Sequence, residues 1–180
     1  IYAKRKDYQK AFENFRIAVL MSPRDKKARL NMARAYYDLG EYAYALDQYQ
    51  RAGELWPHEP EIYFNTAKVY ARMKKGAPAL KGLRVAYRFA PEAAGDVLAV
   101  GDLLLEEDLY DEAAAAYELV LKKDPQSVQA HLKAARVFRK SGQWQRAEDH
   151  LAAGLQAAPE NEELLRERAA LEEFRPRDSR

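Results

Sequence analysis

Apolar and small residues recur at helical spacing throughout the chain. In one segment they occupy i, i+3, i+4 and i+7, at Tyr63, Thr66, Ala67 and Tyr70. A neighbouring segment has the same character, with Ala45, Tyr49 and Ala52. This spacing places the apolar residues on one face of an α-helix and the polar residues on the other. The pattern therefore predicts a series of amphipathic helices in which small residues allow close contact between helix axes.

A second, longer period relates these helices to one another. Prolines stand 34 residues apart at Pro23, Pro57, Pro91, Pro125 and Pro159. Twelve residues before each proline is an alanine, at Ala11, Ala45, Ala79, Ala113 and Ala147. Eight residues before each proline the side chain is large, at Phe15, Tyr49, Leu83, Tyr117 and Leu151. A fixed period of this length indicates a stack of similar helical hairpins.

The repeated columns resemble the tetratricopeptide repeat. In residues 26–59 the matching residues are Met32, Ala33, Tyr36, Ala45, Tyr49, Ala52 and Pro57. Arg29 departs from the pattern, because the family favours Trp or another large residue there; Tyr63, Val97 and His131 follow at this position. The resemblance implies an all-α fold, in which antiparallel helix pairs of 34 residues build a right-handed superhelix, the TPR solenoid.

The columns also divide the chain. We expect the second helix of a truncated repeat in residues 1–25, and complete repeats in residues 26–59, 60–93, 94–127 and 128–161. A polar C-terminal capping helix is expected in residues 162–174, followed by a tail in residues 175–180. Because the sequence opens within a repeat, we expect N-terminal residues of the full protein to be missing.

Several residues are predicted to end or begin helices. Gly40 and Gly142 follow first helices, where a left-handed conformation is easiest for glycine. Lys74 and Asp108 occupy the same position and should terminate their helices less well. Ser127 and Asn161 precede new helices and are expected to be N-caps.

The composition and the absence of catalytic motifs favour a soluble protein without an active site. The chain has no cysteine, and its net charge of +2 gives no reason to expect nucleic acid or an anionic membrane as the partner. No apolar run approaches the roughly 18 residues of a membrane span. The three histidines lack metal-ligand spacing, and no serine has a base or nucleophile elbow beside it. We expect a protein that is not an enzyme and needs no cofactor, located in either the cytoplasm or the periplasm.

The resemblance assigns candidate binding residues to the first helices, which line the concave surface in the tetratricopeptide family. Numbering each repeat from its first residue (Lys26 in the first complete one), the groove-facing positions are 2, 5, 6, 9, 12 and 13. The candidates for partner binding are Leu30, Asn31, Arg34, Tyr37, Phe64, Asn65, Lys68, Arg72, Leu98, Asp102, Leu132, Lys133 and Arg136.

Position 5 is apolar in every complete repeat, at Leu30, Phe64, Leu98 and Leu132. We expect this row to be exposed in the groove, because it does not fall on the face that packs within a repeat; the alternative is contact with the adjacent first helix. Basic residues outnumber acidic ones in the groove. Together these features predict a partner protein that contributes a peptide or helix with acidic side chains and apolar anchors.

Three other functions stay open from the sequence alone. The first is self-association through Phe12, Phe15 and Val19 of the truncated repeat. The second is a role as an accessory region of a larger secretion, assembly or enzyme protein. The third is RNA binding, which the near-neutral charge disfavours.

Overall fold

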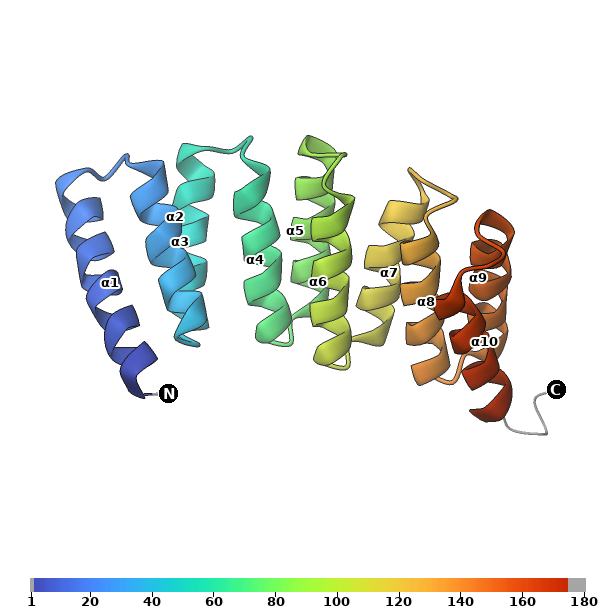
Figure 1. Cartoon of the computed structure of the whole chain (residues 1–180). Coiled ribbons are helices and arrows are strands. Elements are labelled where there is room, and N and C mark those ends of the chain that lie inside the picture. The colour runs from blue at the N-terminus through green and yellow to red at the C-terminus, as the bar shows by residue number, and fades with distance from the viewer. Residues whose placement is uncertain (1, 175–180) are drawn as a thin grey trace. The chain divides into compact units, whose positions relative to one another are not determined.

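The computed structural model describes the backbone of residues 2–174 and the side chains of residues 12–174, so the tail expected in 175–180 lies outside the described residues. These residues form two compact units, an N-terminal unit (Ile1–Glu92) and a C-terminal unit (Ala93–Arg180). All regular structure in the described part of the chain is helical, as Figure 1 shows. The prediction of an all-α fold built from antiparallel helix pairs is confirmed.

The N-terminal unit contains five helices, α1 (Tyr2–Met21), α2 (Lys26–Asp38), α3 (Tyr42–Leu55), α4 (Pro60–Arg72) and α5 (Gly76–Phe89). Each helix contacts the next one along the chain, and α2 also contacts α4. We call α2 and α4 first helices, and α3 and α5 second helices. Two first helices therefore lie side by side in this unit, each backed by its own second helix.

The C-terminal unit contains α6 (Ala94–Glu106), α7 (Tyr110–Leu121), α8 (Val128–Lys140), α9 (Trp144–Ala157) and α10 (Glu162–Phe174). Here the first helices are α6, α8 and α10, and α8 contacts both of the others. The second helices α7 and α9 lie behind them. The same alternation of helices thus builds both units.

Small residues occupy the closest contacts between helices. The alanine column at Ala45, Ala79, Ala113 and Ala147 has no exposed surface. On the first helices, Ala33, Ala67 and Ala135 are likewise fully buried, and Gly101 holds the same position in α6. Because these side chains end at or before Cβ, large residues such as Tyr117 and Leu83 can fill the remaining space.

The helix ends follow the sequence closely. Gly40 and Gly142 have φ of +80° and +74°, and Lys74 and Asp108 adopt the same left-handed conformation with φ of 56° and 62°. Asn161 caps α10 through a bond of 3.0 Å from Leu164 N to its Oδ1. Ser127 stands at the N-cap of α8 without a side-chain capping bond. A cap that the sequence analysis missed is Asp25, whose Oδ1 accepts from Ala28 N at 2.9 Å.

The residue at position 4 of the repeat connects three of the first helices, α2, α4 and α8, to the turn before each of them. Arg29 Nη2, Tyr63 OH and His131 Nε2 each bond to the carbonyl oxygen of the repeat proline six residues earlier, at 2.7, 2.8 and 2.9 Å. Arg29 therefore makes this contact at a position where the tetratricopeptide pattern favours Trp or another large residue. Its poor fit shows in Nε, which is buried without a hydrogen-bond partner among the described residues. Such an unsatisfied donor costs about 1–3 kcal/mol.

In two repeats, the residue at position 4 also forms a polar contact with the residue 19 positions later on the second helix. Arg29 Nη1 donates to Gln48 Oε1 at 3.2 Å, and the Nδ1 atoms of His131 and His150 lie 3.1 Å apart. Because the carbonyl oxygen of Pro125 can only accept, His131 carries its proton on Nε2, and His150 Nδ1–H donates to His131 Nδ1. Burial, together with the nearby His131 and Arg146, lowers the pKa of His150 to about 4, against a smaller opposing effect of Asp149.

This histidine pair predicts a loss of stability in weak acid. The pKa of His150 is about 4 in the folded protein and 6.5 in the unfolded chain, so between these values the unfolded chain binds the proton and the folded protein does not. The free energy of unfolding should therefore fall as pH drops below about 6.5, by about 1 kcal/mol at pH 5 after allowance for the partial exposure of the ring. Urea unfolding at several pH values measures it.

In this test, His150→Gln should flatten the pH dependence relative to the wild type, whatever its effect at pH 7. The control is His58→Gln, which removes an exposed histidine from the N-terminal unit. Equal pH slopes for the wild type and His150→Gln between pH 7 and pH 5 would contradict the assignment.

A matched pair of glycine substitutions on α6 tests the packing. A Cβ at Gly101 would overlap the ring of Tyr117 and lie 3.0 Å from its Cδ1, whereas a Cβ at Gly95 meets nothing within 4 Å. Because the Tyr117 ring is fully buried, Gly101→Ala should lower the free energy of unfolding by about 1–3 kcal/mol. Gly95→Ala should leave it unchanged or raise it by up to about 1 kcal/mol. Denaturant unfolding followed by circular dichroism decides, and equal effects of the two substitutions would show that the contact is unimportant.

Candidate functional site

The apolar row at position 5 is buried, so the expectation that it is exposed in a groove is wrong. Leu30, Phe64, Leu98 and Leu132 are only 8, 5, 6 and 6% exposed. The sequence analysis considered packing within one repeat, but first helices also contact their neighbours, as α2 contacts α4 and α6 contacts α8. These side chains therefore belong to the core. The apolar anchors expected in a partner lose their support.

Four of the polar candidates of the N-terminal unit reach solvent and have no side-chain partner within residues 12–174. Arg34 on α2 is exposed, and Asn31 on α2 and Asn65 and Lys68 on α4 are half-buried. Among the side chains of residues 12–174, none forms a hydrogen bond or ion pair with any of these four. We call these four residues the α2–α4 polar strip. It presents two positive charges and two amide groups on adjacent helices.

Tyr37 and Arg72 flank this strip and are less free. Tyr37 is half-buried, packs against the core of the N-terminal unit and lies 5.6 Å from the ring of Tyr42. Arg72 is half-buried at the C-terminal end of α4 and interacts with other groups of the protein. The sequence analysis grouped both with the groove residues, but the ring of Tyr37 has mainly a packing role.

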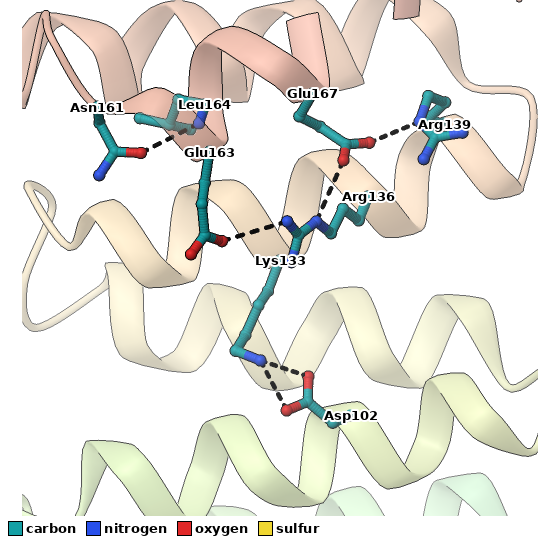
Figure 2. Close-up of polar contacts among 8 residues, drawn as sticks. All are labelled: Asp102, Lys133, Arg136, Arg139, Asn161, Glu163, Leu164 and Glu167. Carbon is teal, nitrogen blue, oxygen red and sulfur yellow. Dashed lines mark hydrogen bonds and ion pairs between the residues drawn. The ribbon is translucent and has the colours of Figure 1, made fainter. Parts of the chain in front are cut away.

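In the C-terminal unit, the corresponding charges are satisfied within the protein. Lys133 Nζ on α8 lies 2.8 and 2.7 Å from the two carboxylate oxygens of Asp102 on α6 (Figure 2). Asp102 Oδ1 also accepts a hydrogen bond of 2.8 Å from Tyr117 OH on α7. Burial and this hydrogen bond raise the pKa of Tyr117 far above its ordinary value, so the phenol stays a donor. Asp102 thus joins three helices.

A second set of ion pairs joins α8 to α10. Arg136 Nε lies 3.1 Å from Glu167 Oε2, and Arg139 Nε lies 2.6 Å from Glu167 Oε1 (Figure 2). Arg136 also reaches Glu163 at 3.3 Å. The Glu167 side chain is only 8% exposed, so removing either arginine would leave a poorly solvated charge. The basic residues that the sequence analysis placed in a binding groove here stabilise the unit instead.

The two sets of contacts share a sequence separation that the sequence analysis missed. The side chain at position 9 of one first helix meets position 6 of the next, 31 residues later, in both Asp102–Lys133 and Arg136–Glu167. The complementary charges at this separation are visible in the sequence. In the N-terminal unit the same separation relates Arg34 to Asn65, which carries no charge.

No reaction chemistry is evident in the described residues. Across residues 12–174, no group of three or more His, Cys, Asp or Glu side chains could hold a metal ion. An open hollow of about 590 Å³ on α4 and α5 is lined by tyrosine and aliphatic groups and by Lys81, and its lining contains no carboxylate or histidine. Among the helices that the structure describes, none is both long and apolar enough to cross a bilayer.

The α1 face proposed for self-association is partly covered. Phe12, Phe15 and Val19 are half-buried, and the Phe12 ring lies 4.7 Å from that of Tyr36 on α2. Among residues 12–21 of α1, the large apolar side chains that are exposed are Ile17, Leu20 and Met21, at 49, 68 and 81%. In this described part of α1, the exposed apolar residues therefore differ from the predicted ones.

Several solved structures have the same fold as this chain, among them structures of TPR proteins. MamA is 17% identical over 86% of this chain and 85% of its own, with a TM-score of 0.64. YrrB, described as a TPR protein with an unusual peptide-binding site, is 17% identical over 93% of this chain and 86% of its own, with a TM-score of 0.61. TTC0263, a thermophilic TPR protein of Thermus thermophilus, is 23% identical over 94% and 93%, with a TM-score of 0.56.

No curated protein matches the sequence. Two family models for the tetratricopeptide repeat do match it. A model described as TPR repeat matches residues 33–74, within the N-terminal unit, and one described as tetratricopeptide repeat matches residues 104–171, within the C-terminal unit. With the repeated columns and the paired helices, these matches show that the chain belongs to the tetratricopeptide repeat family.

Proposed function

We propose that the protein is a non-catalytic interaction scaffold that binds a segment of a partner protein on the first-helix face of its N-terminal unit. Tetratricopeptide repeat proteins generally mediate protein–protein interactions, and the described residues offer polar surface in place of reactive groups. The observation that supports the proposal most is the α2–α4 polar strip, in which two cations and two amides lack partners within the described part of the protein.

The chemistry of the strip suits a polypeptide ligand. An asparagine side chain offers both donors and an acceptor, which are the groups that a peptide backbone requires. Asn31 and Asn65 occupy position 6 of consecutive repeats, so they present the same groups on neighbouring helices. Arg34 and Lys68 occupy position 9 and add positive charge beside them. The segment that best complements this arrangement has accessible backbone amides and acidic side chains.

Two acidic residues of the protein lie near the strip. Asp38 on α2 and Glu61 on α4 are exposed, and both act electrostatically on Tyr49. The groove-facing positions of α2 and α4 also include Lys27 and Arg72, so basic residues still outnumber acidic ones by four to two. The excess of positive charge favours acidic segments and raises their rate of association. YrrB, which has the same fold, is a precedent for peptide binding by a TPR protein. Its 17% identity to this chain supports similarity of fold only.

The proposal predicts a partner that crosslinks to the strip. A photo-reactive amino acid at Asn65 should capture a partner from a lysate of the source organism, whereas the same residue at Tyr44, which is 59% exposed on α3, should not capture it. Adding Arg34→Glu and Lys68→Glu should reduce the captured amount at least ~10-fold, because two favourable charges become repulsive.

Circular dichroism controls for folding, since both charge reversals lie on accessible surface. A partner captured at Tyr44 alone, or captured at Asn65 to the same extent after charge reversal, would show that the strip is not the binding surface. A crosslinked product that consists only of this protein would point to self-association.

A further inference from the structure

We propose that the segment bound by the α2–α4 polar strip is extended and carries two carboxylates three residues apart, one for Arg34 and one for Lys68. This inference rests on the proposed function and adds the conformation and charge spacing of the ligand. It is based on a difference between the two units: charges at equivalent positions form ion pairs in the C-terminal unit but not within the described residues of the N-terminal unit.

The C-terminal unit shows how this protein neutralises a charged residue at position 9. A residue of opposite charge stands 31 positions later on the next first helix, as Lys133 does for Asp102 and Glu167 does for Arg136. Both pairs are within direct hydrogen-bonding distance, at 2.7 and 3.1 Å. The protein therefore closes this part of its own first-helix face.

The N-terminal unit has the charges without their partners. The residue 31 positions after Arg34 is Asn65, which carries no charge. Among residues 12–174, no carboxylate forms an ion pair with Arg34 or with Lys68. Lys68 is half-buried on α4, one repeat after Arg34 on α2. A carboxylate from outside the chain would supply the opposite charge that Glu167 provides for Arg136 in the other unit.

The distance between α2 and α4 defines the spacing of such carboxylates. Arg34 and Lys68 occupy equivalent positions on two helices in contact. Axes of helices in contact lie roughly 8–10 Å apart. A polyproline II segment rises ~3.1 Å per residue and has three residues per turn, so residues i and i+3 point the same way about 9 Å apart. The backbone groups of such a segment make no bonds of their own and are free for Asn31 and Asn65.

The test uses fluorescence anisotropy with a fluorescein-labelled synthetic peptide of sequence Ala-Pro-Asp-Ala-Pro-Asp-Ala-Pro. Three comparison peptides are used. The first has Asn in place of both Asp residues, and the second has the two Asp residues adjacent in sequence. The third is an alanine-rich helix with two Asp residues seven positions apart. The wild-type protein should bind the first peptide at least ~10-fold more tightly than each of the others, with an affinity that falls as salt rises. Arg34→Gln with Lys68→Gln should remove this preference.

A closing variant provides the sharpest comparison. Asn65→Asp puts a carboxylate 31 residues after Arg34, as in the C-terminal unit, and should weaken the first peptide about 10-fold. Gln50→Asp adds the same charge at an exposed position of α3 and should leave its affinity within about 2-fold. Equal effects of these two variants would mean that net charge alone governs binding, and the proposed pairing would be wrong.

The remaining outcomes also decide. Tighter binding of the helical peptide, or no measurable binding of the first peptide, would overturn the extended ligand with this spacing. If crosslinking at Asn65 still captured a partner dependent on Arg34 and Lys68, the proposed function would stand while this inference failed. If peptide binding survived Arg34→Gln with Lys68→Gln unchanged, both would fail.

Discussion

Close contact between the two helices of each repeat is the constraint on which the rest of the structure depends. The alanine column of the second helices has no exposed surface, and it faces first helices that carry alanine or glycine at position 8. These small residues permit the axes to approach, and large side chains such as Tyr117 then fill the space beside them. Because the repeats within one unit share this contact, a given position of one first helix keeps the same relation to its neighbour in the next repeat of that unit.

This fixed relation determines which polar residues are structural. Position 9 of one first helix meets position 6 of the next, so a charge at one of them is neutralised when the opposite charge occupies the other. Exposed ion pairs contribute only about 0–1 kcal/mol to the free energy of unfolding. Glu167 is nearly buried between Arg136 and Arg139, so breaking its ion pairs should destabilise the unit more than breaking an exposed pair. The same two positions in the N-terminal unit hold Arg34 and Asn65, whose side chains form no bond within residues 12–174. These positions therefore form ion pairs in the C-terminal unit and form none within residues 12–174 of the N-terminal unit, where we propose that they bind a ligand.

Much of the fold could be predicted from the sequence because its determinants are local and repeated. Helical periodicity, the small-residue columns and the left-handed residues after first helices all follow from single repeats, and the structure confirms the last even at Lys74 and Asp108. The burial of Leu30 and Phe64 could not be predicted in this way, since it arises when one first helix packs beside another. The polar contact of Arg29 with the preceding turn was also missed, because the family pattern specifies size at that position and gives no hydrogen-bonding role.

The candidate site was predicted only in part, for a related reason. The family resemblance assigned Arg34, Lys68, Lys133 and Arg136 to the groove without distinguishing among them. Their electrostatic surroundings nevertheless differ. Comparing residues 31 apart would have separated them, since Lys133 and Arg136 have acidic partners at that distance and the other two do not. The useful signal was the sequence separation between neighbouring first helices, in addition to the repeat length of 34.

The measurement that tests this account most directly is a backbone NMR titration of the isotopically labelled protein with the peptide that carries two Asp residues three apart. The account predicts that amide signals of α2 and α4 around Asn31, Arg34, Asn65 and Lys68 shift progressively with peptide concentration. Signals around Asp102, Lys133 and Arg136 should stay in place, because their charges are already paired. Shifts confined to α6 and α8, or spread equally over both units, would contradict the claim that only the unpaired cations are available to a partner.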